Sequence, residues 1–432
     1  MSKKVSTQPY KGARDFYPED KRFQQWMFDK WKRVVERYGY VEYDAPILEP
    51  TDIYLMKGSE EIVKEQTYTF KDRGDRSVTI RTEMTPTVSR MVAGRRQELA
   101  YPARWYSIPG LWRYERMQRG RGREFYQLNV DVFGIDSMQA ELEMVQIMDG
   151  IFQTFKAKRS TYVIKLNSRV LVNEVLKQAG INADNVTPVI RLIDRLNKMP
   201  TKEFVDRLDE LTGDKAVSAK IVSFLQSNTV KELDPTLLEM ESVRSLNAII
   251  GSCKELGISN IEFDTSLMRG FDYYTDIVFE AFDTDPENNR SMFGGGRYDG
   301  LVAQFGADPI PTVGFGMGDM TFQNFLESHG LIPDLKLSND LTVVIRDQSA
   351  TNAAFKAAKE LREIGVNTAV DYSGRKIDKQ LKNAIKSGVR YVLFVGEENA
   401  NEDLYTLKDM KTGKEEKHSL ARIVSIVKDS RK

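Results

Sequence analysis

The chain has 432 residues, of which 41% are hydrophobic and 29% are charged, and 63 basic residues balance 63 acidic ones. This length suffices for two or three folded domains, and zero net charge means that nucleic-acid binding would depend on local basic patches. The single cysteine, Cys253, excludes an intramolecular disulfide and a cysteine-based zinc site, and the two histidines, His329 and His418, disfavour a multi-histidine metal site. The N-terminus lacks an apolar signal core, so we expect a cytoplasmic protein without membrane contact.

The first predicted element is an amphipathic helix that begins at Pro18 and ends at Gly39. Its apolar residues recur with helical spacing, which is typical of a helix that packs on a core. An extended stretch follows from Tyr40 to Leu55 and contains Pro46. Because proline has no backbone N–H, we expect this stretch at a sheet edge or at a dimer interface.

A short strand over residues 78–81 leads into Glu83 and Thr85, and we predict a helix from Thr87. Glu83 and Thr85 alternate onto the same side of the extended chain, where a carboxylate and a hydroxyl can accept hydrogen bonds from an ammonium group. The alternative is structural: Thr85 caps the helix and Glu83 pairs with a nearby arginine.

Residues 104–123 hold six arginines against one acid, Glu115, and an alternating run follows at residues 125–133. We predict a hairpin with strands at 105–114 and 125–133 and a basic loop at 117–122. The second strand has an apolar face, made of Tyr126, Leu128, Val130 and Val132. Its other face carries Phe125, Gln127, Asn129, Asp131 and Phe133.

Two amides and a carboxylate in a row suit the floor of a ligand site better than a core. Arg113 on the first strand would add a guanidinium for a phosphate, facing the same pocket as Gln127 and Asp131. A solvated hairpin that only binds polyanions is the alternative. That alternative explains the loop arginines but not Asp131.

Helical signals dominate the middle of the chain. We predict a helix over residues 136–158 with Asp136 or Ser137 as its N-cap, a strand over 161–166 and a helix over 167–180. Residues 184–256 are helical almost throughout, and strands resume at 261–264. The pattern therefore predicts a helical insertion within a sheet-containing domain.

Two further clusters contain candidate functional residues. Residues 269–275 (RGFDYYT) precede a strand at 277–280 and bring Arg269, Tyr273 and Tyr274 to its start. Residues 294–300 (GGGRYDG) allow close backbone approach to a ligand or a strand, and residues 311–318 form a glycine-rich strand before a helix to about His329. Ordinary tight turns explain either cluster equally well in isolation.

Residues 334–340 are predicted to link a first domain, residues 1–333, to a second, residues 341–432. The second domain shows alternating strands and helices, which favours a small α/β fold with mostly parallel strands. Six basic residues against one acid lie between Gly374 and Arg390. They form either a solvated helix face or an RNA contact.

Taken together, these motifs resemble the histidyl-tRNA synthetase family of class II aminoacyl-tRNA synthetases. The resemblance begins at GARDFYP (12–18) and the Pro46 strand, which is similar to class motif 1, and continues through Arg113 to Asp131, similar to motif 2. RTEMTP (81–86), RGFDYYT and GGGRYDGL (294–301) resemble the family's histidine motifs, and GEEN (396–399) with LKDMKTG (407–413) resembles its anticodon-binding module. The resemblance implies an α+β fold: a class II antiparallel-sheet catalytic core with a helical insertion, followed by an α/β anticodon-binding domain.

The resemblance also implies residue roles. Arg113 and Arg269 would be catalytic, holding the α-phosphate of ATP while histidyl-adenylate forms. Histidine would contact Glu83, Thr85, Gln127, Asp131, Tyr273 and Tyr274, with Asp131 and Tyr274 bonding the imidazole nitrogens. Glu115, Arg121 and Arg123 would join the two catalytic arginines around ATP, and Gln118 and Arg119 would meet the tRNA acceptor end. Implied partners are L-histidine, ATP with its Mg²⁺ (without a protein-held metal), tRNA(His) and a second copy of the chain.

One position departs from the family pattern. Class motif 3 has an arginine in the helix after the glycine-rich strand, whereas Thr321 stands at that place here. That arginine usually braces the γ-phosphate, so we expect another cation, such as Arg121 or Arg123, to replace it, or weakened use of ATP. The alternative function is a non-catalytic, synthetase-like regulatory paralogue that binds histidine or RNA.

Overall fold

The computed structural model of the chain describes residues 5–55, 66–196, 199–269, 273–288, 290–335, 339–400 and 403–430. The chain divides into two compact units, Met1–Ile332 and Pro333–Lys432. Among the described residues, no helix is long and apolar enough to span a membrane.

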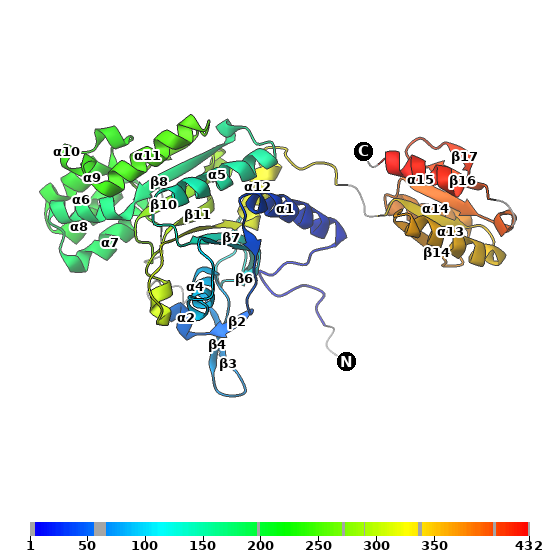
Figure 1. Cartoon of the computed structure of the whole chain (residues 1–432), viewed down its shortest axis with the longest axis horizontal. Helices are drawn as coiled ribbons and strands as arrows, with labels where there is room; N and C mark the ends of the chain where they lie inside the picture. Colours follow the sequence, from blue (N-terminus) through cyan, green and yellow to red (C-terminus); the bar gives the residue numbers. More distant parts are fainter. Residues whose placement is uncertain are drawn as a thin grey trace. The chain divides into compact units, whose positions relative to one another are not determined.

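A large, mainly antiparallel sheet forms the centre of the first unit (Figure 1). Its strand order is β1 (Val41–Glu42), β5 (Ala103–Ser107), β7 (Glu124–Phe133), β12 (Thr312–Gly318), β11 (Ser291–Arg297), β10 (Ile277–Asp283), β8 (Tyr162–Ser168) and β9 (Ile261–Phe263), with β6 (Gly110–Trp112) paired to β7. Among the described strands of this sheet, the outermost pairs, β1 with β5 and β8 with β9, are parallel and the others are antiparallel. The predicted antiparallel core is confirmed.

Three helices pack on the apolar face of this sheet: α1 (Pro18–Arg37), α5 (Gln139–Thr154) and α12 (Asp319–Ser328). Trp31 of α1 and Phe152 of α5 each lie 5.7 Å, centroid to centroid, from the ring of Phe322 on α12. Leu128 and Val130 of β7 belong to the same buried cluster. The predicted helix at 18–38 and the predicted core face of the second hairpin strand are both confirmed.

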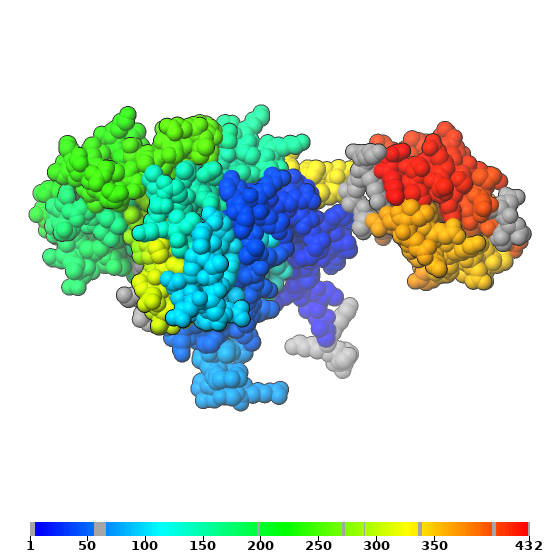
Figure 2. Space-filling view, viewed as in Figure 1, coloured from blue at the N-terminus to red at the C-terminus, as the bar shows by residue number. Residues whose placement is uncertain are grey.

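The stretch from Tyr40 to Leu55 differs from the prediction, because it is not extended throughout. It forms β1 at the edge of the large sheet, β2 (Leu48–Pro50) in a separate sheet and the short helix α2 (Asp52–Leu55), with Pro46 between the two strands. β2 pairs with β4 (Ser77–Ile80), which pairs in turn with β3 (Tyr68–Lys71). Figure 2 shows this β3–β4 hairpin, in light blue, projecting from the surface of the unit. The edge position of β1 agrees with the expectation.

The predicted first strand of the basic hairpin, residues 105–114, is two strands. β5 and β6 both pair with β7, at Tyr106 opposite Val130 and at Gly110 opposite Tyr126. The strand breaks at Pro109, which cannot donate a ladder hydrogen bond. Helix α5 likewise begins later than predicted: Met138 is its N-cap residue, without a side-chain cap.

Helices fill the chain between β8 and β9, as predicted. They are α6 (Arg169–Ala179), α7 (Ala183–Ile193), α8 (Thr201–Thr212), α9 (Lys215–Leu225), α10 (Pro235–Leu238) and α11 (Glu241–Glu255), drawn in green in Figure 1. Val189, Leu208 and Ile221 from three of these helices are buried in the core that continues from the large sheet. Helix α4 (Thr85–Gly94) starts two residues before the predicted Thr87.

The second unit is a five-stranded sheet with helices α13 (Thr351–Glu363), α14 (Ile377–Lys386) and α15 (Leu420–Asp429). The strand order is β14 (Thr368–Asp371), β13 (Leu341–Ile345), β15 (Tyr391–Val395), β16 (Tyr405–Asp409) and β17 (Glu415–His418). The prediction of mostly parallel strands is confirmed for β14, β13 and β15, whereas β16 runs antiparallel to both β15 and β17. The sheet ends with strand β17, which pairs with β16 and was not predicted.

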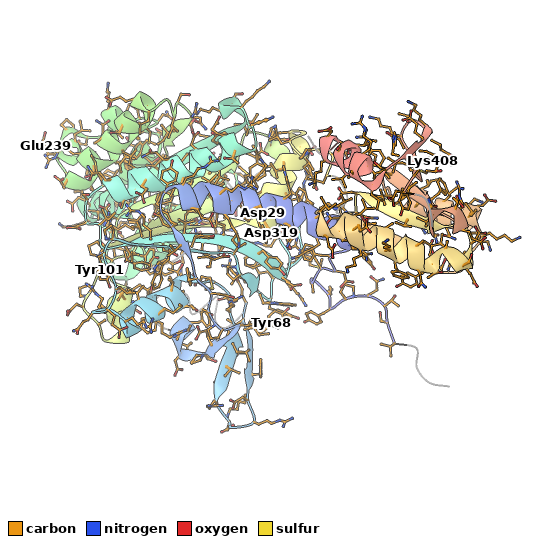
Figure 3. The ribbon with its side chains drawn as sticks, turned by 45° about the vertical axis from the view of Figure 1, so that its right-hand side comes forward. Asp29, Tyr68, Tyr101, Glu239, Asp319 and Lys408 are labelled. Carbon is orange, nitrogen blue, oxygen red and sulfur yellow. The ribbon has the colours of Figure 1, made fainter. Side chains whose placement is uncertain are left out.

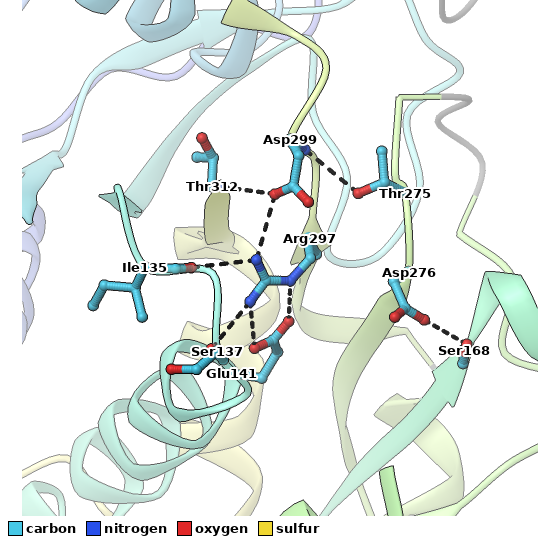
Figure 4. Close-up of polar contacts among 9 residues, drawn as sticks. All are labelled: Ile135, Ser137, Glu141, Ser168, Thr275, Asp276, Arg297, Asp299 and Thr312. Carbon is cyan, nitrogen blue, oxygen red and sulfur yellow. Dashed lines mark hydrogen bonds and ion pairs between the residues drawn. The ribbon is translucent and has the colours of Figure 1, made fainter. Parts of the chain in front are cut away.

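A buried ion pair fixes β11 to the N-terminus of α5 (Figure 4). The Arg297 guanidinium donates to both carboxylate oxygens of Glu141, at 2.6 and 2.8 Å. It also donates to the backbone carbonyls of Ile135 and Ser137, at 3.3 and 3.2 Å. Asp299 lies 3.5 Å from the same guanidinium and accepts from the Thr312 backbone N–H. The arginine of the GGGRYDG motif is therefore a buried structural residue.

Removing this arginine should destabilise the first unit. Arg297→Ala leaves the Glu141 carboxylate buried without its partner, and we expect a loss of roughly 3–5 kcal/mol in the free energy of unfolding. Urea denaturation of the full chain, followed by tryptophan fluorescence, measures it. The control is Arg207→Ala, whose exposed pair with Glu203 should be worth less than about 1 kcal/mol. Equal, small losses in both variants would contradict the structural role.

Candidate functional site

A cavity of about 1040 Å³ opens on the face of the large sheet that the helices leave uncovered. Strands β7, β10, β11 and β12 contribute to its wall, together with the loop between β6 and β7. Every residue that the motif resemblance assigns to histidine lines it: Glu83, Thr85, Gln127, Asp131, Tyr273 and Tyr274. Arg113, Glu115, Arg121 and Arg269 line it as well.

The polar face of β7 forms the floor. Phe125, Gln127, Asn129 and Asp131 line the cavity, while the intervening residues of the strand point into the core or its margin. This arrangement follows from the period of two in a strand, because successive side chains point to opposite faces. The neighbouring strand β12 carries glycines opposite three of these residues: Gly314 pairs with Asp131, Gly316 with Asn129 and Gly318 with Gln127.

Glycine is required at two points around the floor because polar side chains lie against the backbone. A Cβ added at Gly314 would lie 2.0 Å from the Asp131 carboxylate oxygen. A Cβ added at Gly294 would overlap the Arg269 guanidinium. The glycine-rich segments are therefore sheet strands over which functional side chains lie, and the tight-turn alternative for residues 294–297 is wrong.

Asp131 is 4% exposed and accepts a 2.5 Å hydrogen bond from the Tyr298 hydroxyl. Its second carboxylate oxygen, Oδ2, has no hydrogen-bond partner among the described residues. Burial raises the pKa of Asp131 to about 7, although the bond from Tyr298 opposes the rise. A buried carboxylate with a free oxygen that faces a cavity is suited to accept a hydrogen bond from a ligand.

Tyr298 was not predicted to belong to the site. It stands in the GGGRYDG motif one residue after Arg297, so strand alternation sends its side chain to the opposite face, toward the cavity and away from α5. The alternation was visible in the sequence, but the partnership with Asp131 was not, because it joins residues on strands far apart in the chain.

Glu83 lies on the other side of the cavity and accepts a hydrogen bond of 3.2 Å from the Tyr273 hydroxyl. Burial raises the pKa of Glu83, and the positive charge of Arg113 opposes this shift. Thr85 lies in the first turn of α4, whose N-cap residue is Met84. The capping alternative for Thr85 is therefore wrong, and both residues line the cavity. Residues 270–272, which belong to the same motif as Tyr273, lie outside the described residues.

Two arginines flank the region between these acids and the basic loop. Arg113 donates from Nε to the Thr82 carbonyl at 3.1 Å, and its guanidinium lies 5.2 Å from the centroid of the Phe125 ring. Arg269 pairs with Glu280 and has a left-handed backbone with φ of 55°. The cavity therefore joins an acidic and amide-bearing region to a cationic one.

The loop residues are distributed differently from the expectation. Arg121 pairs with Glu115 at 2.7 Å. Arg123 does not appear among the residues that line the cavity; its guanidinium stacks on Tyr114 at 4.0 Å from the ring centroid. Gln118 and Arg119 also lie off the lining and contact Arg290 and Glu287, respectively.

Asp319 is a further buried acid at the cavity, and it was not predicted. It begins α12, near the centre of the first unit in Figure 3. Its carboxylate accepts from the Arg14 guanidinium at 2.7 Å and from the Tyr126 backbone N–H at 3.0 Å. This pair holds the N-terminal segment against β7, and the Gly12 carbonyl accepts from the backbone N–H groups of Arg123 and Glu124.

The chain matches two family models, one described as histidyl-tRNA synthetase over residues 12–319 and one as anticodon binding domain over residues 340–430. A histidine–tRNA ligase from Leptospira biflexa is 41% identical over 431 residues, covering 99% of this chain and 98% of the relative.

Two solved structures are similar over almost the whole chain. Histidyl-tRNA synthetase from Nostoc has a TM-score of 0.83 and 23% identity, covering 99% of this chain and all of that one, and so supports the fold. Apo histidyl-tRNA synthetase from S. aureus has a TM-score of 0.75 and 25% identity, covering 98% of this chain and all of that one. Because the first family model spans most of the chain and a relative exceeds 30% identity over its full length, this protein belongs to the histidyl-tRNA synthetase family.

Proposed function

We propose that the chain ligates L-histidine to tRNA(His) through a histidyl-adenylate intermediate. The observation that carries the proposal is the single cavity in which the amide and carboxylate floor of β7 meets Arg113 and Arg269. Full-length relatives that are named histidine–tRNA ligases agree with this activity. In the first step the histidine carboxylate attacks the α-phosphorus of ATP and pyrophosphate leaves. In the second step a ribose hydroxyl of the terminal tRNA adenosine attacks the acyl carbon and AMP leaves.

The acidic end of the cavity supplies the contacts for histidine. Glu83 and Thr85 accept from the ammonium group, and Gln127 lies on the same floor strand as Asp131. Asp131 accepts from one imidazole N–H through its free Oδ2, and Tyr274 bonds the other ring nitrogen. A site that hydrogen-bonds both ring nitrogens rejects apolar analogues by about 10⁴-fold or more, because its own buried groups would be left unpaired.

The cationic end supplies the contacts for the reacting phosphate. In this proposal Arg113 and Arg269 stabilise the charge that develops on the α-phosphate oxygens, and the contacts with Thr82 and Glu280, respectively, orient their guanidinium groups. Preorganised cations of this kind stabilise the transition state without a reorganisation cost. ATP brings Mg²⁺ with its phosphates as part of the substrate.

The remaining partners follow from the family. The unit that matches the anticodon-binding model would contact the tRNA anticodon, with the basic residues of α14 as candidates, and Gln118 and Arg119 would contact the acceptor end. A homodimer in the cytoplasm is the expected form. In this proposal residues 1–333 form the catalytic domain, with a helical insertion at 184–256. Residues 341–432 form the anticodon-binding domain. No observation favours the regulatory paralogue.

Histidine-dependent ATP–pyrophosphate exchange without tRNA tests the function. We expect exchange with histidine and not with the other amino acids, because only an imidazole satisfies both Asp131 and Tyr274. Absence of exchange by a chain that still binds histidine in calorimetry would refute the proposed enzyme and support the regulatory paralogue.

Arg269→Ala should slow adenylate formation on the order of 10²-fold or more while the histidine dissociation constant changes little, since the arginine acts on the transition state. Single-turnover kinetics and calorimetry separate the two quantities. The variant leaves Glu280 without its partner, so Arg269→Ala/Glu280→Ala serves as the matched control. Parallel losses in binding and rate, or recovery of the rate in the double variant, would contradict the role.

Histidine binding should strengthen as pH rises from about 6 to about 8. The free Asp131 carboxyl has a pKa of about 7, and its ionised form, present above that pH, is the better acceptor for an imidazole N–H. Asp131→Asn should raise the KM for histidine by about 10-fold or more and leave only the titration of free histidine, near pH 6.5. Exchange kinetics across this range check it, and identical pH profiles for the two proteins would exclude Asp131 as the titrating group.

A further inference from the structure

Among the described residues, four arginines line the cavity, and they differ in whether an acid neutralises them. Arg121 is paired with Glu115, and Arg269 is paired with Glu280. Arg113 lies near enough to Glu83 for its positive charge to oppose the rise in the pKa of that carboxyl. The fourth, Arg290, makes no ion pair with any described residue; its guanidinium donates to the side-chain carbonyl of Gln118.

Arg290 lies at the part of the cavity lined by the basic loop. A Cβ placed on Gly120 would lie 3.6 Å from Cδ of Arg290 and 3.1 Å from Cγ2 of Thr321. The side chains of Arg290 and Thr321 therefore flank one glycine of the loop, and both line the cavity. Thr321 is the position at which the motif pattern has an arginine. Because Thr321 carries no charge, α12 supplies no cation at this position. The cation in this part of the cavity is Arg290, which lies just before β11.

The two cations that we expected to replace the missing arginine have other partners. Arg121 holds Glu115, and Arg123 is stacked on Tyr114, outside the lining. Among the described residues near Thr321, Arg290 is thus the arginine whose guanidinium has no carboxylate partner. A guanidinium held by one neutral amide at the rim of a cavity is suited to a phosphate, because it retains its charge and several N–H donors.

From this geometry we infer that Arg290 binds the terminal phosphates of ATP, at the part of the cavity that the basic loop lines. The inference rests on the proposed function for the identity of the nucleotide. Gln118 orients the guanidinium, and Gly120 keeps the loop backbone close enough for Arg290 and Thr321 to lie beside it. Arg290 is then a binding residue for the leaving pyrophosphate, with no part in holding histidine.

The test compares ATP with AMP, which lacks the phosphates in question, by calorimetry on the full chain. Arg290→Ala should weaken ATP binding by about 10-fold or more and leave AMP binding within about 2-fold, because a charge-assisted contact is lost only for ATP. The control, Arg95→Ala, removes an exposed arginine paired with Glu98 and should change neither. Unchanged ATP binding by Arg290→Ala, or equal weakening of ATP and AMP, would overturn the inference.

A second variant tests whether positions 290 and 321 lie at the same phosphate site. Arg290→Ala/Thr321→Arg should regain at least about 3-fold of the lost ATP affinity, because an arginine on α12 would extend beside the same glycine. No recovery would overturn the claim that the two positions serve one phosphate site. These binding measurements do not require turnover. Failure of histidine-dependent exchange in the unaltered chain would refute the enzyme, whereas normal exchange with an unaffected Arg290→Ala variant would refute only this inference.

Discussion

The two faces of strand β7 are the constraint on which the first unit depends. One face places Leu128, Val130 and Val132 in the core beneath α1 and α5, and the other places Gln127, Asn129 and Asp131 in the cavity. A shift in register by one residue would bury the amides and the carboxylate and expose the apolar side chains. The core therefore fixes the orientation of the site, because the residues that hold the strand in place alternate with those that face the ligand.

Placing polar groups on such a floor requires partners for them. Asp131 and Glu83 are both buried, and burial raises the pKa of each carboxyl. Tyrosine hydroxyls satisfy one oxygen of each, from Tyr298 and Tyr273. The free Oδ2 of Asp131 remains, and a buried acceptor without a partner costs about 1–3 kcal/mol until a donor arrives. A ligand with a correctly placed N–H removes that cost, so the affinity of the site and its selectivity have the same source.

Much of the fold could be predicted from local patterns. Helix α1, the two faces of β7 and the helical region between β8 and β9 follow from periodicities of 3.6 and 2. The division of the first hairpin strand into β5 and β6 and the antiparallel strands of the second unit could not, since strand direction and pairing depend on residues distant in the chain. The motif resemblance assigned ten of the residues that line the cavity but gave no role to Tyr298, because a motif names positions and does not give contacts.

In the basic loop, too, the sequence shows which residues are present but not which partners they have in the fold. Six arginines between residues 104 and 123 suggested an abundance of phosphate ligands. In the folded chain Arg104 pairs with Glu143, Arg121 with Glu115 and Arg119 with Glu287, while Arg123 stacks on Tyr114. Of the six, Arg113 and Arg121 line the cavity, and Arg290, from outside the cluster, is the cation beside Thr321. Tertiary contacts, and not the number of arginines in a segment, thus decide which guanidinium groups face the cavity.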